Sequence, residues 1–473
     1  MDLLNRSAAQ MADGIRLGLF SGVQLIEASL ARAAEVQAEL NAFTIIDNTG
    51  ALLAAMNVDR MVAEGKPLPS LAGVPIVIKD LTPTKGMPTT LGSLTTGDGE
   101  THEDAIIVQR LRQAGAIIVA KSTTSEFAYS SFTRSKRFGV TRNPWNVNRT
   151  PGGSSGGSAV AVATRVVPFA EGTDMGGSIR SPAAACGVVG FKPSLGRIPM
   201  TILPTPIDTI SHFGPLAYSV EDAVAFVATT SGPSDLDLLS QMTPFQIGKC
   251  KLVGLNGLRF AFSLDLGYCA VSSDVEVVIR DAVARVREQG AIVDEIDIRW
   301  TRDVMDQWLL KWAAFLGLFP SGRPLESRNF MDPALARLIE RGEVVTAASL
   351  KRTELLQSGM ASDMAQIFGR YDAFLCPTNA ITAPVAEASD SDFEGTVADG
   401  YMRAFDMTHP FNLVPTYPVI SLPVGLAADG LPVGIQVVGR RYGDERVLSL
   451  AAGMEKIFAR CPLSWTGASN LTT

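Results

Sequence analysis

Two residue types on which many catalytic and metal sites depend are scarce in this sequence. The 473 residues include only three histidines (His102, His212 and His409), and no spacing of the HExxH kind relates them. The five cysteines are odd in number, scattered and without CxxC spacing, which argues against a disulfide framework and a zinc site. They are Cys186, Cys250, Cys269, Cys376 and Cys461. We therefore expect no metal, no cofactor and a reducing, cytoplasmic compartment.

Long apolar runs and clusters of basic residues are also absent. Nowhere do about 18 apolar residues follow one another, as a membrane-spanning helix requires. The N-terminal segment carries acidic side chains and no continuous apolar stretch, unlike an export signal. The formal net charge is −7 and no long cluster of Lys or Arg appears, whereas binding along a nucleic-acid backbone needs a basic stripe. The sequence thus predicts no membrane and no nucleic-acid partner.

The composition is that of a protein with a large buried core. Hydrophobic residues make up 46% and charged residues 19%, far from the composition of a disordered chain. Length alone suggests two or three domains. However, no internal repeat, low-complexity tract or evident linker divides the chain, so we prefer one elaborated α/β domain over residues 1–473.

Apolar periodicity indicates the order of the elements. From Ala8 to Leu40 it predicts two amphipathic helices broken near Ser21 and Gly22, within a helical lead-in over 1–65. Short β-branched runs at 73–80 and 115–122, with a helix between them, give a strand-helix-strand texture. Further predicted elements are a helix over Asp104–Gln113, strands at 258–264 and 291–298, a helix over Ser273–Gln289, helices across 300–370, a hairpin at 419–439 around Asp429 and Gly430, and a helix over Glu445–Arg460.

Three serines stand in glycine-rich turns within residues 151–193. Ser154 and Ser155 lie in GGSSGGS, and Ser178 lies in DMGGSIR. Glycines at such positions allow backbone N–H groups to converge on one point, although tight turns alone would also explain either loop. The Walker, GxGxxG and GxSxG patterns are all missing, and the shortage of histidine makes a Ser-His-Asp triad hard to assemble.

Lys79 is the candidate for the base that a serine nucleophile needs. It closes the apolar strand Val74–Ile78, where burial would disfavour the ammonium form and lower the pKa of the side chain. The alternative is that Lys79 extends to solvent from the end of the strand.

Taken together, these segments resemble those of the amidase signature hydrolases, over Ser7 to about Arg460. The segments that carry the resemblance are GVPIVIKD (73–80), NPWN (143–146), the long block at 152–198, GPLAYSVEDA (214–223), CPTNAITAP (376–384) and the ending at 421–440. The resemblance implies a single large α/β/α domain with a central twisted mixed β-sheet flanked by helices. It also assigns the amidase signature core to residues 66–200 and a helical substrate-pocket region to 300–370.

The resemblance further implies a role for each candidate residue. Lys79 would be the general base, Ser154 a relay held by a cis peptide in the GGSS turn, and Ser178 the nucleophile. The oxyanion hole would be formed by the backbone N–H groups of Met175, Gly176, Gly177 and Ser178. Ser155, Asp174 and Arg180 would support the loops, although a surface ion pair would give Asp174 and Arg180 the same spacing. Cys186 fits a buried small hydrophobe better than a thiol nucleophile.

Substrate choice is expected from segments that are apolar or aromatic. They are Tyr129, the loop 202–210 and the stretch 308–319, where Trp308 and Phe315 are candidates for substrate contact. We expect a small-molecule amide with a neutral aryl or alkyl acyl group. Carbamates, hydrazides and esters present the same carbonyl, and core packing is the alternative for 308–319.

Two other functions stay open at this stage. One is the glutaminase-type subunit of a tRNA-dependent amidotransferase, but the acidic residue expected shortly before the final SxP block is not evident in 409–423. The segment 409–423 also departs from the commoner NxxGxP motif of the family, at Pro415, Thr416 and Tyr417. The other is a non-catalytic scaffold role, against which the intact Lys79, Ser154 and Ser178 argue. A homodimer is one assembly that the sequence allows.

Overall fold

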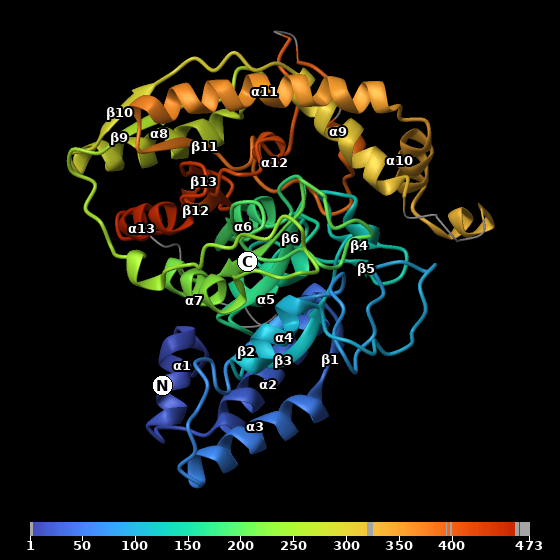
Figure 1. The fold of residues 1–473 in the computed structure, drawn as a ribbon, viewed down its shortest axis with the longest axis vertical. Coiled ribbons are helices and arrows are strands. Elements are labelled where there is room, and N and C mark those ends of the chain that lie inside the picture. Colours follow the sequence, from blue (N-terminus) through green and yellow to red (C-terminus); the bar gives the residue numbers. More distant parts are fainter. Residues whose placement is uncertain (1–2, 319–324, 394, 398–399, 459–462, 464–473) are drawn as a thin grey trace.

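A mixed β-sheet runs through the part of the chain that this computed structural model describes, namely residues 3–318, 325–393, 395–397, 400–458 and 463 (Figure 1). Eleven strands pair in the order β1 (Phe43–Ile46), β3 (Ile117–Ser122), β2 (Pro75–Lys79), β6 (Phe169–Asp174), β8 (His212–Ala217), β7 (Val189–Lys192), β12 (Val419–Leu426), β13 (Pro432–Val438), β11 (Ala373–Pro377), β9 (Arg259–Phe262) and β10 (Ile292–Glu295). β2 is parallel to β3 and β6, whereas β6 is antiparallel to β8. The expected α/β class with a mixed sheet is confirmed.

Helices flank this sheet. They are α1 (Ala8–Arg16), α2 (Gly22–Leu40), α3 (Asn48–Ala63), α4 (Ile106–Gln113), α5 (Gly156–Ala163), α6 (Arg180–Cys186), α7 (Val220–Thr230), α8 (Ser273–Glu288), α9 (Asp303–Leu316), α10 (Pro333–Glu343), α11 (Ala347–Arg370), α12 (Pro410–Leu413) and α13 (Asp444–Glu455). Short 3-10 turns are η1 (Leu3–Asn5), η2 (Glu126–Ala128), η3 (Ile247–Lys249), η4 (Leu325–Phe330) and η5 (Asp390–Phe393), and a separate small hairpin joins β4 (Arg134–Ser135) to β5 (Gly139–Val140). In Figure 1, α1 to α3 lie at the lower end and α11 crosses the upper end.

The N-terminal helices begin where the sequence supplies caps. Ser7 and Ser21 each accept a hydrogen bond from the backbone three residues on, and Gln10 and Gln24 return one, so both helices begin with a capping box. The prediction that 1–65 is a helical lead-in missed one element. The strand β1 lies between α2 and α3 and pairs antiparallel with β3. Four residues are too few for a strand periodicity to be told from a loop.

The centre of the sheet explains why the glycine-rich segments lie together. Every residue of β2, β3 and β6 is buried, as is typical of strands covered on both faces. α5 begins directly after the GGSS turn, and α6 begins shortly after β6 ends. Because β2 and β6 are parallel neighbours, Lys79 and Asp174 end their strands at the same edge of the sheet.

The C-terminal elements agree with the sequence patterns. The hairpin around Asp429 and Gly430 is formed by β12 and β13, which pair antiparallel. The helices expected across 300–370 are α9, α10 and α11, with 319–324 outside the described residues. The predicted helix over Glu445–Arg460 corresponds to α13, and its last two residues also lie outside the described residues. Strands from both halves of the chain share one sheet, and the single-domain organisation stays a prediction.

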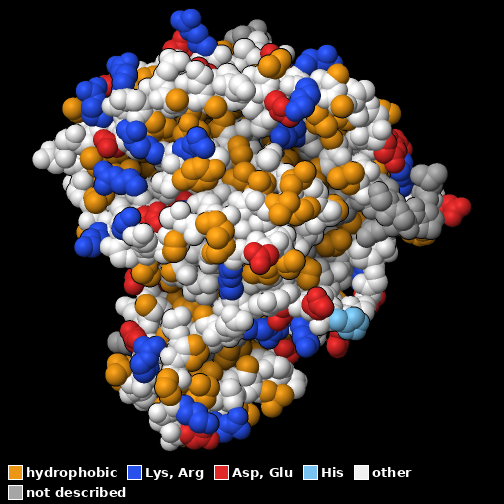
Figure 2. Space-filling view, in the orientation of Figure 1, with side chains coloured by type: hydrophobic (Ala, Val, Ile, Leu, Met, Phe, Trp, Pro, Cys, Tyr) orange, Lys and Arg blue, Asp and Glu red, His pale blue; other side chains and the backbone are white. Residues whose placement is uncertain are grey.

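The surface of the described chain bears on the expected partners. No described helix combines the length and apolarity needed to cross a membrane. On the face drawn in Figure 2, Lys and Arg side chains are separated by apolar and neutral ones and form no continuous stripe.

Candidate active site

Lys79 is buried at the end of β2 and faces three hydroxyl groups. Its Nζ lies 2.7 Å from Ser154 Oγ, 2.8 Å from Ser155 Oγ and 2.9 Å from Thr173 Oγ1. The side chain is 0% exposed, so the alternative in which Lys79 reaches solvent is wrong. All three donors of an ammonium group would find acceptors here, and a neutral amine could instead accept a proton from one of the hydroxyls.

Burial sets the charge of this lysine. It lowers the pKa of Lys79 to about 7, while the carboxylates of Glu171 and Asp174 act in the opposite direction. Burial likewise raises the pKa of Glu171 to about 7, partly offset by hydrogen bonds from the Lys79 backbone N–H and the Thr82 hydroxyl. A substantial fraction of neutral Lys79 at physiological pH is therefore expected.

The turn that carries Ser154 and Ser155 fits tightly against its surroundings. The Gly153–Ser154 peptide bond is cis, as the family resemblance leads one to expect. A Cβ atom on Gly153 would lie 2.7 Å from the Ser131 carbonyl carbon, so only glycine fits there. The Ser155 N–H donates to the Ser178 carbonyl at 3.2 Å, which fastens this turn to the second glycine-rich loop.

In that second loop, residues 174–179, Gly176 and Ser178 are partly exposed and the other residues are buried. Within the described chain the Ser178 hydroxyl forms no hydrogen bond, and the N–H groups of Met175, Gly176 and Ser178 donate to no described acceptor. The Gly177 N–H, in contrast, donates to Asp174 Oδ1 at 2.9 Å. Three of the four N–H groups expected in the oxyanion hole are therefore free of described acceptors, whereas the Gly177 N–H is already bonded to Asp174.

Two side chains from distant segments hold the carbonyl groups of the same loop. Trp308 Nε1 on α9 donates to the Met175 carbonyl at 2.8 Å, and Thr408 Oγ1 donates to the Gly176 carbonyl at 2.6 Å. A Cβ atom on Gly177, whose φ is +129°, would lie 1.7 Å from Thr408 Oγ1. The Met175 and Gly176 carbonyl groups share peptide planes with the Gly176 and Gly177 N–H groups. The two contacts therefore also fix the directions of these N–H groups.

Asp174 and Arg180 support this loop from below as a buried ion pair. Both side chains are 0% exposed and their closest charged atoms are 2.9 Å apart, so the surface-pair alternative is wrong. Burial alone would raise the pKa of Asp174, but the Arg180 guanidinium and the Asn412 amide hold it well below its usual range. Arg180 also donates to the Thr408 carbonyl, Gln436 and Asn412. Asp174 is thus a fixed anion that binds the loop to α12 and β13.

A pocket opens above Ser178. Its empty space is about 420 Å³, part of it open to solvent, which suits a small molecule. The described residues that line it are Ala128, Tyr129, Ser130, Ser131, Gly153, Met175, Gly176, Gly177, Ser178, Met305, Trp308, Trp312, Asp406 and His409.

The predicted substrate contacts meet this pocket only in part. Tyr129 and Trp308 line it, but Phe315 does not, because it stacks on Trp312 with ring centroids 5.5 Å apart. Phe315 instead packs in a buried cluster with Ile210, which belongs to the loop 202–210, and no residue of that loop lines the pocket. Cys186 is buried, as expected of a small hydrophobe.

Several residues of the site were missed by sequence reasoning. Glu171 and Thr173 alternate with small residues along β6, so a charged residue within a buried strand was a usable indication. Asp406 and His409 line the pocket just before and within 409–423. Asp406 accepts a hydrogen bond from Ser131, and His409 contacts Tyr268 and Trp308. These partners are distant in the sequence, so no local pattern reveals the contacts.

Comparisons with known proteins identify the family of this chain. The profile of the Amidase family matches residues 24–448. An acylamidase of Rhodococcus erythropolis is 33% identical over 454 residues, which cover 95% of each chain. One chain of the glutamyl-tRNA(Gln) amidotransferase of Acidothermus cellulolyticus is 34% identical over 487 residues, covering 97% of this chain and 95% of that one. The crystal structure of a bacterial aryl acylamidase superposes with a TM-score of 0.89 at 27% identity, covering 96% of both chains.

The chain therefore belongs to the amidase signature family. Within that family, both acylamidases and amidotransferase components are similar to it, so the shared property is amide hydrolase chemistry.

Proposed function

We propose that this protein hydrolyses the C–N bond of a carboxylic amide through an acyl-enzyme formed on Ser178. The observation that carries the proposal is the 2.7 Å contact between the buried Lys79 Nζ and Ser154 Oγ, beneath a pocket lined by Ser178. A lysine whose pKa is lowered to about 7 is able to act as a base near neutral pH.

The reaction proceeds in two proton-balanced halves. Ser178 Oγ attacks the amide carbonyl while its proton passes to Ser154, whose own proton passes to neutral Lys79. The oxyanion is stabilised by the free N–H groups of Met175, Gly176 and Ser178. When the intermediate collapses, the proton returns through Ser154 to the leaving amine, and the acyl group stays on Ser178.

Water completes the cycle by the same proton path. It attacks the acyl carbonyl, gives its proton through Ser154 to Lys79, and the collapsing intermediate releases the carboxylic acid as Ser178 recovers its proton. Carbamates, hydrazides and esters fit the same scheme, because each presents a carbonyl with a leaving group to the same N–H donors.

The pocket favours a small apolar acyl group. Tyr129, Trp308 and Trp312 supply aromatic surface, and Met305 adds a flexible apolar wall. We therefore assign an aryl or alkyl acyl group to the substrate, as the name of the similar aryl acylamidase also suggests for that protein.

A glutaminase component of an amidotransferase is the second candidate, because several relatives carry that name. Glutamine has an α-carboxylate, which proteins normally bind with Arg or Lys. No Arg or Lys is among the described residues that line the pocket. We accordingly favour a stand-alone hydrolase. Purification from the native cell distinguishes the two, since a partner protein that co-elutes in equal amount would favour the amidotransferase.

Labelling with a fluorophosphonate probe tests the nucleophile. We expect the probe to add its mass to the peptide that contains Ser178, and Ser178→Ala to abolish both labelling and the hydrolysis of a neutral nitroanilide. Ser181, buried three residues further on in α6, offers a matched control, and Ser181→Ala should label as the wild type does. Labelling that survives Ser178→Ala would show that the nucleophile lies elsewhere.

A further inference from the structure

Among the described residues that line the pocket, Asp406 supplies the one carboxylate. Its side chain is 14% exposed, and it lines the same pocket as Ser178 and Trp308. Burial acts to raise the pKa of Asp406, but hydrogen bonds from His409 and Thr408 hold it below its ordinary value. The group is therefore an anion at neutral pH.

The carboxylate still has room for another donor. Oδ1 accepts the Thr408 N–H at 3.4 Å and lies 2.8 Å from Thr408 Oγ1 and 3.5 Å from His409 Nδ1. Oδ2 accepts one hydrogen bond, from Ser131 Oγ at 3.2 Å. Since two carboxylate oxygens offer about four acceptor sites, a substrate group in the pocket can add a donor at Oδ2.

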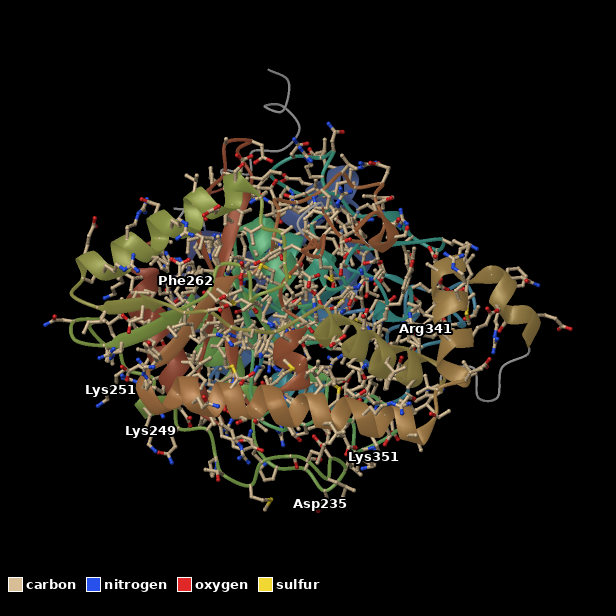
Figure 3. All side chains as sticks on the ribbon, turned by 90° about the horizontal axis from the view of Figure 1, so that it is seen from above. Asp235, Lys249, Lys251, Phe262, Arg341 and Lys351 are labelled. Atoms are coloured by element: carbon tan, nitrogen blue, oxygen red, sulfur yellow. The ribbon has the colours of Figure 1, made fainter. Side chains whose placement is uncertain are left out.

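No Arg or Lys among the described residues forms an ion pair with Asp406. Apart from His409, it forms no ion pair with a described residue. On the helices beside the pocket, Lys311 of α9 bonds to Thr209 and Gln357. Arg341 on α10 and Lys351 on α11 are exposed, and Lys351 lies near the outer edge of the molecule in Figure 3. A second acid lies nearby, since Asp390 Oδ1 accepts the Ser131 N–H at 3.0 Å, although burial raises the pKa of Asp390.

We propose that Asp406 is a specificity-determining residue, and that the pocket selects aryl or alkyl amides whose acyl group bears an amine over those that bear a carboxylate. A carboxylate in a pocket that Trp308, Trp312 and Tyr129 also line is a combination that binds organic ammonium groups, through hydrogen bonding and cation–π attraction. A substrate carboxylate would instead face the Asp406 carboxylate in a partly buried site, where like charges repel. This inference rests on the proposed amide hydrolysis and specifies the charge of a substituent on the acyl group of the substrate.

Three nitroanilides of nearly equal length test the proposal, with pentanoyl, 5-aminopentanoyl and glutaryl groups. For the wild type we expect kcat/KM to fall in the order amine, neutral, carboxylate, by about tenfold or more at each step. In Asp406→Asn the three values should converge. Asp235→Asn is the matched control, because Asp235 is exposed at the periphery of the molecule (Figure 3) and should preserve the order.

The outcomes separate this inference from the proposed function. Cleavage of the pentanoyl compound that depends on Ser178 supports the hydrolase whatever the charge preference is. A wild type that prefers glutaryl, or an Asp406→Asn variant that keeps the original order, would overturn the role of Asp406. A uniform fall for all three substrates would show that Asp406 only supports the loop through Thr408.

A binding measurement covers the case in which Asp406→Asn is inactive. Dissociation constants of benzylammonium and benzoate would be compared in Ser178→Ala and in Ser178→Ala with Asp406→Asn. The second substitution should weaken benzylammonium at least about tenfold and strengthen benzoate. Unchanged constants for both ligands would contradict the proposal.

Discussion

Lys79 is a buried amine whose three nearest polar partners are all hydroxyl groups, at 2.7–2.9 Å. If it is the base, Lys79→Ala should lower kcat/KM at neutral pH by about 10²–10⁴-fold, the usual contribution of a general base. Lys121 on the adjacent strand is the matched control, because it is equally buried but bonds to Thr82 and Thr89 rather than to the serines. Lys121→Ala should lose stability while the folded fraction stays active. A near-normal rate in Lys79→Ala would place the base elsewhere.

The charge on Glu171 gives a second prediction, for the pH dependence. Activity needs neutral Lys79, so kcat/KM should rise with pH through the pKa of about 7. The Glu171 carboxylate raises the pKa of Lys79 by stabilising its ammonium form. Glu171→Gln removes that charge, so the acid limb of the pH profile should move to lower pH. Because the two groups titrate together, the limb reports on the pair.

The control for this experiment is Glu221→Gln, which changes an exposed acid on α7 and should leave the profile in place. An acid limb that moved to higher pH in Glu171→Gln would mean that the titrating group is not a buried base beside this carboxylate.

At this scale, local patterns in the sequence point to the residues of the glycine-rich block, whereas most other residues that line the pocket leave no such pattern. Ser154 and Ser178 are tied to local turns, and Lys79 closes a strand, so each leaves a local pattern. The roles of Asp406 and Glu171 depend on contacts with residues on other elements, which a local sequence pattern does not show. The hydrogen bond from the Gly177 N–H to Asp174 likewise depends on the orientation of the Asp174 side chain within the loop, which the sequence pattern does not reveal.

Among the elements, α9 contributes most to both the pocket and the catalytic loop. Trp308→Phe keeps the aromatic surface but removes the N–H that holds the Met175 carbonyl. We expect kcat to fall by up to about tenfold, the contribution of one hydrogen bond, with KM little changed. Trp312→Phe is the control, since its N–H reaches only the Tyr129 carbonyl at 3.4 Å. Steady-state kinetics with the neutral nitroanilide would measure both, and equal losses in kcat would contradict a positioning role for Trp308.

The sequence predicted α9 as a helix but not which of its side chains face the substrate. Met305, Trp308, Trp312 and Phe315 recur at helical spacing and share one face. The first three line the pocket, and Phe315 lies beyond it against Trp312. A periodic pattern shows which residues share one face of a helix. Which of those residues line a pocket depends on how the helix packs against other elements.

For the whole molecule, the central sheet joins segments from both halves of the chain, with β7 paired to β8 on one side and to β12 on the other. The apolar patterns predicted β2, β3, β9, β10 and the hairpin of β12 and β13, but not the central strands β6, β7 and β8 or the strand β11. The edge strand β1 was missed because a short strand leaves a weak pattern.

Arg180 links these halves through polar contacts. It lies 2.9 Å from Asp174 and donates to Gln436 on β13 and to Asn412 on α12. Arg180→Met would leave the Asp174 carboxylate buried without its counter-ion, and it should lower the free energy of unfolding by about 3–5 kcal/mol. Urea denaturation followed by circular dichroism and by tryptophan fluorescence would measure the loss, provided that the two transitions coincide.

Lys351→Met is the matched control for Arg180→Met, because Lys351 pairs with Glu354 on an exposed face of α11, with side chains 75% and 56% exposed. Such surface pairs contribute about 0–1 kcal/mol, so this variant should unfold almost as the wild type does. If Arg180→Met were no less stable than Lys351→Met, the buried pair would not be what fastens the catalytic loop to the C-terminal strands. In that case, any loss of activity in Arg180→Met would arise locally in the loop 174–179. The substitution leaves the Asp174 carboxylate without its counter-ion, and this carboxylate accepts the hydrogen bond from the Gly177 N–H next to Ser178.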